Sequence, residues 1–433
     1  MSKNLRINKN NFIDQTTRIS FKFNGQKLFG YKGDTLASAL LANNIHLVGR
    51  SFKYHRPRGI MTCGSEEPNA IVQIGNDPSL TDPNVRATEI ELYEGLDASS
   101  QNCWPSVNFD IGGINNFLSP LLPAGFYYKT FMWPASFWEK YEYFIRHSAG
   151  LGKAPTKSDP DIYDHQYSHC DVLVVGGGIS GIISAKLSAE KGLDTILIDD
   201  KSFLGGSTIY QENECYKINS VNSNKWLANE IESLKNYPNL LIKNRTSLAA
   251  FHGYNYLLAR ENLTDHLNIN ERKGKVRQRL WKIRAKKVII ASGSIERPLI
   301  FSNNDRPGII LSSSIKKYID YYGVKTGENI SLFTNNDSAY ETAISLYKSG
   351  VKVNVIVDIR KNSDSLIVKE ALDLGLKVLW ESTVVDTQGY KRIKSFEVMK
   401  LSDDGNNVVG DRSKYNCDCL GISGGWTPMV HLF

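Results

Sequence analysis

The sequence DVLVVGGGISG, residues 171–181, decides the fold of this chain. Its first five residues form an apolar, β-branched run, which is typical of a buried parallel strand. Gly176, Gly178 and Gly181 then give the pattern G-x-G-x-x-G, and apolar side chains recur at helical spacing over residues 182–191. A second apolar strand, residues 195–198, leads to Asp199. The pattern predicts a strand–turn–helix–strand unit of the dinucleotide-binding type.

Each residue of this pattern has its own expected role. Gly176 allows the tight turn, Gly178 lets a pyrophosphate approach the backbone, and Gly181 lets the helix pack against the strand. The helix N-terminus then offers free N–H groups to the phosphates. Asp199 can accept hydrogen bonds from an adenosine ribose, and its charge would repel a 2′-phosphate. The sequence therefore favours NAD, with FAD as the alternative, over NADP.

Composition sets wider bounds. A chain of 433 residues with 41% hydrophobic and 22% charged residues is expected to form two or three globular domains. No apolar run is long enough to span a bilayer, and residues 1–10 lack an apolar signal core, so we expect a cytoplasmic protein without membrane contact. The cysteines are scattered, and His165 and His169 have no further ligand nearby, so no metal site is predicted. The net charge of +7 comes with no nucleic-acid-binding module.

The first part of the chain predicts a small β-grasp domain. Strands are expected over residues 18–23 and 26–31 around an Asn-Gly turn, followed by a helix over 36–43 and strands over 70–75 and 87–91. Two segments leave alternatives open. The basic, aromatic loop 49–59 is either a solvated loop or a loop that faces phosphate or a partner. The aromatic-rich residues 108–146 are either a connector packed on the main domain or a subunit interface.

The strand–helix–strand plan recurs later in the chain, with strands over residues 329–334 and 351–357 and a helix over 338–349. The turn between them, Thr334 to Ser338, has no glycine, and Asp337 would repel phosphate. We therefore expect this second unit to keep the fold without binding a dinucleotide. Between the two units, strands over residues 256–260 and 279–283 predict a β-meander, and Leu248 is expected beside the adenine.

Several stretches carry a more specific resemblance: RSFKYHRPRG at 50–59, EEPNA at 66–70, ERP at 296–298 and NNDRPG at 303–308. With residues 333–340 and 424–433, they resemble the α subunits of heterotetrameric sarcosine oxidase. The resemblance implies an α/β, glutathione-reductase-like two-dinucleotide fold preceded by a ferredoxin-like β-grasp domain. Cluster-bearing relatives have several cysteines in the loop where this chain has only Cys63, so we expect no iron–sulfur cluster.

The resemblance also implies domain boundaries and further site residues. We expect a ferredoxin-like domain over 1–95, an aromatic connector over 96–165, a dinucleotide-binding domain over 166–305, a glycine-poor second domain over 306–410, and a return to the first domain over 411–433. Beyond the residues already named, the expected cofactor-binding residues are Ser180, Asp200, Lys201, Gly206, Ser207, Ser292, Gly293, Ser423 and Gly424.

In the family, sarcosine is oxidised at a FAD of a β-type subunit, electrons pass to FMN at the subunit interface, and glycine, hydrogen peroxide and methylenetetrahydrofolate result. The resemblance thus implies a partner β subunit, smaller subunits, sarcosine and tetrahydrofolate, with NAD resident in this chain. No catalytic residue can be assigned. Because the chain stops at Phe433, before the folate-binding domain of the family, we expect a fragment, a truncated product or half of a split subunit. A non-catalytic dinucleotide-binding scaffold, or a relative acting on proline, opines or glycine, is the alternative.

Overall fold

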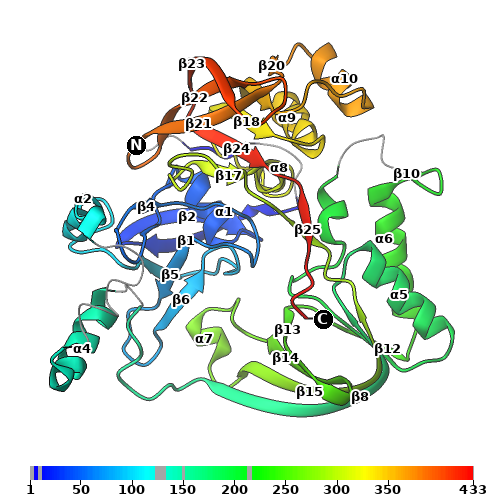
Figure 1. The fold of residues 1–433 in the computed structure, drawn as a ribbon. Coiled ribbons are helices and arrows are strands. Elements are labelled where there is room, and N and C mark those ends of the chain that lie inside the picture. Colours follow the sequence, from blue (N-terminus) through cyan, green and yellow to red (C-terminus); the bar gives the residue numbers. More distant parts are fainter. Residues whose placement is uncertain (1–3, 8–11, 122–132, 149–151, 212–216, 433) are drawn as a thin grey trace. The chain divides into compact units, whose positions relative to one another are not determined.

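The computed structural model describes residues 4–7, 12–121, 133–148, 152–211 and 217–432, which form two compact units (Figure 1). Unit 1 comprises Met1–Asp159 and Glu296–Gly425, and unit 2 comprises Pro160–Ile295 and Trp426–Phe433. Both contain parallel strands with helices between them, so the predicted α/β fold is confirmed. Among the described residues, no helix has the length and apolar character needed to cross a bilayer.

The first half of unit 1 contains a five-stranded sheet in the order β2-β1-β7-β5-β6. The Asn24-Gly25 turn joins its first two strands as predicted, with Phe23 opposite Gln26. Thr35 caps the helix, whose residues are all buried. A strand over 87–91 was wrongly predicted: the edge strand lies over 82–86, because Ala87 already turns to bond Ala70. The elements are β1 Asp14–Phe23, β2 Gln26–Lys32, α1 Leu36–Ala42, β3 Gly49–Arg50, β4 Pro57–Arg58, β5 Ile71–Ile74, β6 Asp82–Arg86 and β7 Asp97–Ser100.

The basic loop 49–59 binds other parts of unit 1 through its arginines. Arg50 is buried and donates to the carbonyl of Val107 at 2.6 and 3.0 Å. Arg56 forms an ion pair with Asp305 at 2.7 Å, and Arg58 pairs with the same carboxylate. The sequence analysis left two alternatives for this loop: a solvated loop, or one that faces phosphate or a partner. Neither describes Arg56 and Arg58, because both pair with Asp305 of the same chain.

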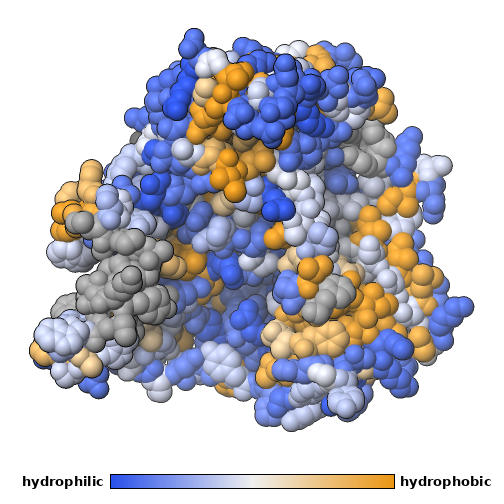
Figure 2. All heavy atoms as spheres, viewed as in Figure 1, coloured by the Kyte–Doolittle hydropathy of each residue, from blue (hydrophilic) through white to orange (hydrophobic). Residues whose placement is uncertain are grey.

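The aromatic-rich segment that follows exposes many of its rings. Trp104 and Phe109 are each 69% exposed, Phe117 is 84% exposed and Trp133 is 83% exposed. Figure 2 shows apolar side chains gathered over α2. Phe126, Tyr127, Tyr128 and Phe131 lie outside the described residues. The elements here are η1 Ile111–Gly113, α2 Ile114–Phe117, η2 Ser119–Leu121, η3 Ala135–Phe137 and α4 Trp138–Ser148.

The second half of unit 1 is a doubly wound sheet in the order β17-β24-β18-β19-β20, with every neighbouring pair parallel. A three-stranded antiparallel sheet, β21-β22-β23, accompanies it. The sequence assigned residues 411–433 to the first dinucleotide-binding domain, but residues 411–425 belong to unit 1, because the buried strand β24 pairs with β18. The elements are β17 Ile309–Leu311, α8 Ser312–Asp320, β18 Asn329–Thr334, α9 Ser338–Lys348, β19 Lys352–Asp358, α10 Leu366–Asp373, β20 Val378–Leu379, β21 Ser382–Gly389, β22 Ile393–Leu401, β23 Val408–Asn416 and β24 Cys419–Ser423.

Unit 2 has one six-stranded sheet in the order β12-β9-β8-β15-β14-β13, in which β12, β9, β8 and β15 are parallel and the β-meander is antiparallel. Two strands are far longer than predicted, because exposed polar residues extend them into the meander. The elements are β8 Ile162–Val175, α5 Ile179–Glu190, β9 Thr195–Ile198, η4 Gly206–Tyr210, β10 Lys217–Ile218, β11 Val221–Asn222, α6 Ser223–Ser233, η5 Leu234–Asn236, β12 Leu240–Lys243, β13 Thr246–His252, η6 Gly253–Asn255, β14 Tyr256–Asn262, α7 Ile269–Arg272, β15 Val276–Ile290, β16 Ser294–Glu296 and β25 Trp426–Pro428.

Candidate functional site

The glycine turn of unit 2 joins β8 to α5 and has the geometry that the sequence predicted. Gly176 has φ +107°, a conformation that L side chains rarely adopt. A Cβ on Gly181 would collide with the carbonyl oxygen of Gly176, so only glycine lets α5 begin this close to the strand. The two outer glycines are therefore required by the fold itself.

Gly178 differs from the other two glycines, because a Cβ built on it would meet nothing within 4 Å. Its φ of −72° suits any residue, so the fold does not require glycine here. The helix that follows has no side-chain cap, which leaves its first N–H groups available. This open space in front of an uncapped helix N-terminus fits the pyrophosphate of a dinucleotide.

Asp199 follows β9 and lies directly beside the turn. Its carboxylate accepts a hydrogen bond from the N–H of Gly177 at 2.5 Å and another from the N–H of Lys201 at 2.9 Å. Burial raises the pKa of Asp199, and the neighbouring charge of Asp200 raises it further, despite these two bonds. The acid is thus fixed in place by backbone groups, where it can also receive ribose hydroxyl groups.

Other predicted residues surround the same turn. The N–H of Gly205 donates to the carbonyl of Gly177 at 2.8 Å, and a Cβ on Gly206 would approach the Cα of Gly178 to 3.0 Å. The segment before Ser292 and Gly293 packs on the other side, because a Cβ on Gly176 would meet the carbonyl of Ala291. Gly177 and Gly205 were not predicted as site residues; their part in the turn depends on backbone bonds between segments far apart in sequence.

The remaining predicted residues do not all lie at the glycine turn. Ser180 and Ser207 are exposed, and Asp200 and Lys201 form an ion pair with each other at 2.7 Å. Leu248 lies in β13, which begins beside β9 because Thr246 N–H donates to the carbonyl of Asp199. Ser423 and Gly424 belong to unit 1, where the Oγ of Ser423 accepts from Asn336 at 2.9 Å. The candidate site is therefore built from unit 2 residues.

The second turn, between β18 and α9, is filled by its own side chains. Asn336 accepts from the N–H of Ser338 at 3.0 Å, which uses a donor at the helix N-terminus. Asp337 forms an ion pair with Arg360 at 2.6 Å, and Arg360 also binds Asp358 at 2.7 Å. The turn thus leaves fewer donors for an anion than the glycine turn does.

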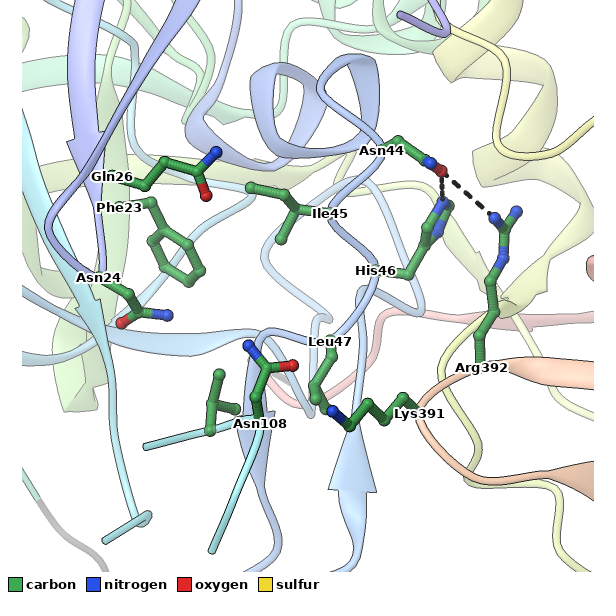
Figure 3. A pocket seen from close by; sticks show the side chains of 11 residues that line it. Phe23, Asn24, Gln26, Asn44, Ile45, His46, Leu47, Asn108, Lys391 and Arg392 are labelled. Atoms are coloured by element: carbon green, nitrogen blue, oxygen red, sulfur yellow. Dashed lines mark hydrogen bonds between the residues drawn. The ribbon is translucent and has the colours of Figure 1, made fainter. Parts of the chain in front are cut away.

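Unit 1 also contains a pocket of about 420 Å³, lined by the β1–β2 turn, the segment after α1, Val107, Asn108 and the β21–β22 turn (Figure 3). Asn44 accepts hydrogen bonds from His46 at 3.0 Å and from Arg392 at 3.3 Å. The lining is made of amides, two cations, a histidine and apolar residues, and it contains no carboxylate, hydroxyl or thiol side chain. Its titratable side chains are therefore those of His46, Lys391 and Arg392.

The loop after β4 is held together by Glu67, which is only 1% exposed. Its carboxylate accepts from the backbone N–H groups of Met61, Thr62, Asn69 and Ala70 at 2.6–2.9 Å. Cys63 lies buried in the same loop. Among the described residues, no three histidine, cysteine or acidic side chains converge as a metal site.

Two family models match parts of the chain. Residues 16–103 match the "2Fe-2S iron-sulfur cluster binding domain", and residues 171–215 match the "FAD dependent oxidoreductase". The expectation that the N-terminal domain has no cluster is therefore wrong, since the matched family points to an iron–sulfur cofactor. That expectation counted thiols in a single loop, whereas ligands are brought together in space, and the matched range also contains Cys103.

Whole-chain relatives extend these partial matches. The α subunit of sarcosine oxidase from Rhizobium meliloti (strain 1021) is 42% identical over 99% of this chain and 42% of its own length. That of Corynebacterium sp. (strain U-96) is 31% identical over 97% of this chain and 38% of its own.

Among solved structures, L-proline dehydrogenase from P. horikoshii shares the fold, with a TM-score of 0.59 and 18% identity over 98% of this chain and 63% of that chain. The two curated relatives are each more than twice as long as the part that they share with this chain. Nearly the whole chain is therefore homologous to the α subunits of sarcosine oxidase, and it spans about two-fifths of their length.

Proposed function

We propose that this chain is the dinucleotide-binding part of an α-type subunit in a sarcosine oxidase complex. The complex would convert sarcosine to glycine, with hydrogen peroxide and methylenetetrahydrofolate as the other products. Oxidation would depend on a flavin-bearing partner subunit, and this chain would be inactive alone. Sequence identity of 42% over nearly the whole chain to a sarcosine oxidase α subunit supports the assignment of the complex.

The observation that carries the proposal is the open position at Gly178, with Asp199 fixed beside it. Backbone N–H groups at the start of α5 would hold the pyrophosphate, and the carboxylate of Asp199 would accept from the ribose. A bound adenine dinucleotide supplies a ring that can take or give hydride. The residues of this turn only bind and orient that ligand, since the turn has no general acid–base pair.

The partner part of the proposal is supported by the exposed aromatic segment. Phe117 and Trp133 leave more than four-fifths of their surface in solvent, and rings of this size are typical anchors of protein interfaces. The sequence left open whether this segment is a packed connector or an interface. Its exposure favours the interface.

Extraction of the bound ligand tests whether the glycine turn binds a dinucleotide, and which one. The protein is purified, denatured and analysed for released adenine nucleotides. Asp199 favours NAD, whereas the matched oxidoreductase family is named for FAD. The two ligands are told apart by absorbance, because only FAD contains a flavin. Release of FAD in stoichiometric amount assigns FAD to the turn. A protein that neither retains nor rebinds either dinucleotide contradicts the proposed site.

Oxygen uptake tests whether oxidation of sarcosine depends on a partner subunit. The purified chain is supplied with sarcosine, FAD and FMN, without a partner subunit, and we expect no turnover above the rate without protein. Adding the flavin-bearing subunit of a related complex is the positive arm. Turnover by the chain alone would place the oxidation site within these residues and refute the proposed dependence on a partner. If turnover is absent in the positive arm and the dinucleotide is retained, a non-catalytic scaffold is favoured.

A further inference from the structure

One surface of unit 2 is basic and aromatic: the outer face of its sheet across β8, β15 and β14. The register places the odd-numbered residues 163–169 of β8 beside the even-numbered residues 278–284 of β15. These in turn lie beside the even-numbered residues 256–262 of β14. We call these twelve residues the basic face. They include Arg260, Lys282 and Arg284 and no aspartate or glutamate.

The basic face is the solvent side of the sheet. Side chains alternate along each strand, and the residues of the opposite face, such as Leu257, Trp281 and Ile283, belong to a buried cluster. On the basic face Tyr167 is 66% exposed and Tyr163 is 49% exposed. The face is therefore open to a partner across three adjacent strands.

Two of its cations are held in place over tyrosine rings. The ammonium of Lys282 lies 4.9 Å from the ring centre of Tyr167 and donates to its hydroxyl group at 3.2 Å. The guanidinium of Arg284 lies 5.0 Å from the ring centre of Tyr256 and donates to the carbonyl of Tyr254 at 3.0 Å. Such stacking reduces the side-chain freedom that a partner would otherwise have to restrict on binding.

Two acids of the same strands, Asp164 and Glu261, lie on the opposite face and have partners there. Asp164 binds Arg279 at 2.8 Å, and Glu261 accepts from the indole nitrogen of Trp281 at 2.6 Å. Just beyond the basic face, Asp171 forms an ion pair with Lys286 at 2.6 Å. No carboxylate on the basic face itself neutralises its three cations.

We propose that the basic face docks an acidic surface of a partner protein. Single-stranded nucleic acid is less favoured, because Lys282 and Arg284 already lie over the rings on which bases would stack. A second copy of this chain is disfavoured by its net charge of +7. The inference goes beyond the proposed function, because it concerns any acidic protein partner and does not depend on the dinucleotide.

The test measures binding of fluorescent decaglutamate, and of a thymidine decanucleotide, by anisotropy at physiological ionic strength. The variant pair Lys282→Glu with Arg284→Glu reverses the basic face. The matched control is Lys191→Glu with Lys225→Glu, two exposed lysines at α5 and α6 with the same change in net charge. We expect saturable decaglutamate binding that falls about tenfold or more in the first pair and less than about threefold in the control.

Every other outcome counts against the proposal. Equal losses in both pairs would show attraction by net charge alone, and the absence of saturable binding would remove the docking site. Tighter binding of the decanucleotide than of the peptide would assign the face to nucleic acid. If the reversed pair unfolds by circular dichroism, the neutral pair Lys282→Gln with Arg284→Gln replaces it. Dinucleotide retention is measured on the same samples, so failure of docking and failure of the proposed function are separate results.

Discussion

The two strand–turn–helix–strand units of this chain follow the same backbone plan with opposite turn chemistry. Gly178 and Asp337 each precede the helix, Gly181 and Tyr340 are each its third residue, and both second strands lead to an aspartate. In unit 2 the position before the helix is open, whereas in unit 1 it holds a carboxylate paired with Arg360. The same backbone plan can thus leave space and backbone donors at the helix N-terminus or fill them, and the residues of the turn decide which.

The third helical position should give the largest effect, because in unit 2 it has no room for a side chain. Tyr340 is fully buried in unit 1 and donates to Asp358 at 2.8 Å, whereas Gly181 in unit 2 has a carbonyl where its Cβ would be. We predict that Gly181→Ala lowers the free energy of unfolding by about 3 kcal/mol or more, because the backbone of α5 must shift. Urea unfolding followed by circular dichroism measures this. The matched control Gly178→Ala should stay within about 0.5 kcal/mol, and equal losses would contradict the assigned roles.

The position before the helix should separate binding from folding. Gly178→Val places a branched side chain in the open space and is expected to weaken dinucleotide binding more than about a hundredfold. Isothermal titration with NAD and with FAD measures the affinity, and thermal unfolding without ligand checks the fold. Retention of wild-type affinity for both would mean that the pyrophosphate does not approach the backbone at this turn.

The two aspartates should respond differently to loss of charge. Asp199→Asn should cost about 1–3 kcal/mol of dinucleotide binding, because one charge-assisted acceptor is removed. Asp358→Asn is the matched variant: it should leave that affinity unchanged and lower stability instead, since Asp358 is buried and binds Arg360. The pair of measurements is affinity by titration and stability by urea unfolding. A loss of affinity in Asp358→Asn would show that the second turn takes part in binding.

The smallest expected effect is a pH dependence. Burial raises the pKa of Asp199 above 3.8. Burial also acts to raise the pKa of Asp337, but hydrogen bonds from Arg360, Ser365 and Ser363 and the charge of Arg360 together outweigh it and lower that pKa. The ionised form of Asp199 is the acceptor for ribose, so affinity should fall as the pH falls through its raised pKa, by at most about tenfold per pH unit. Asp199→Asn should abolish this dependence.

The sign of the stability effect is opposite for the two acids. Because the pKa of Asp199 is raised on folding, unfolding free energy of the ligand-free chain declines as pH rises from 3.8 through the folded-state pKa. The lowered pKa of Asp337 gives a contribution that is lost only as pH falls below 3.8. The difference between the wild-type stability curve and that of each variant, Asp199→Asn or Asp337→Asn, isolates these two trends. Difference curves of the same sign for both variants would contradict the contrast.

The local features of both turns could be predicted from the sequence. Gly176, Gly178 and Gly181 act within one strand–turn–helix segment, so their spacing was enough to predict a turn with space for a pyrophosphate. The same reasoning identified the second turn as poor in glycine. The turn geometry could be predicted because its causes lie within a few residues: positive φ, absence of a Cβ and the direction of helix N–H groups.

Features that depend on distant partners became visible only in the folded chain. Arg56 and Arg58 looked free in the sequence, but Asp305 pairs with both. The strand Cys419–Ser423 was assigned to the wrong domain, because an apolar run does not reveal which sheet it joins. The basic face likewise arises only when register aligns β8, β15 and β14. The cause is the same in each case. Ion pairs, strand order and register join residues far apart along the chain, and a local sequence pattern does not predict which distant residues will meet.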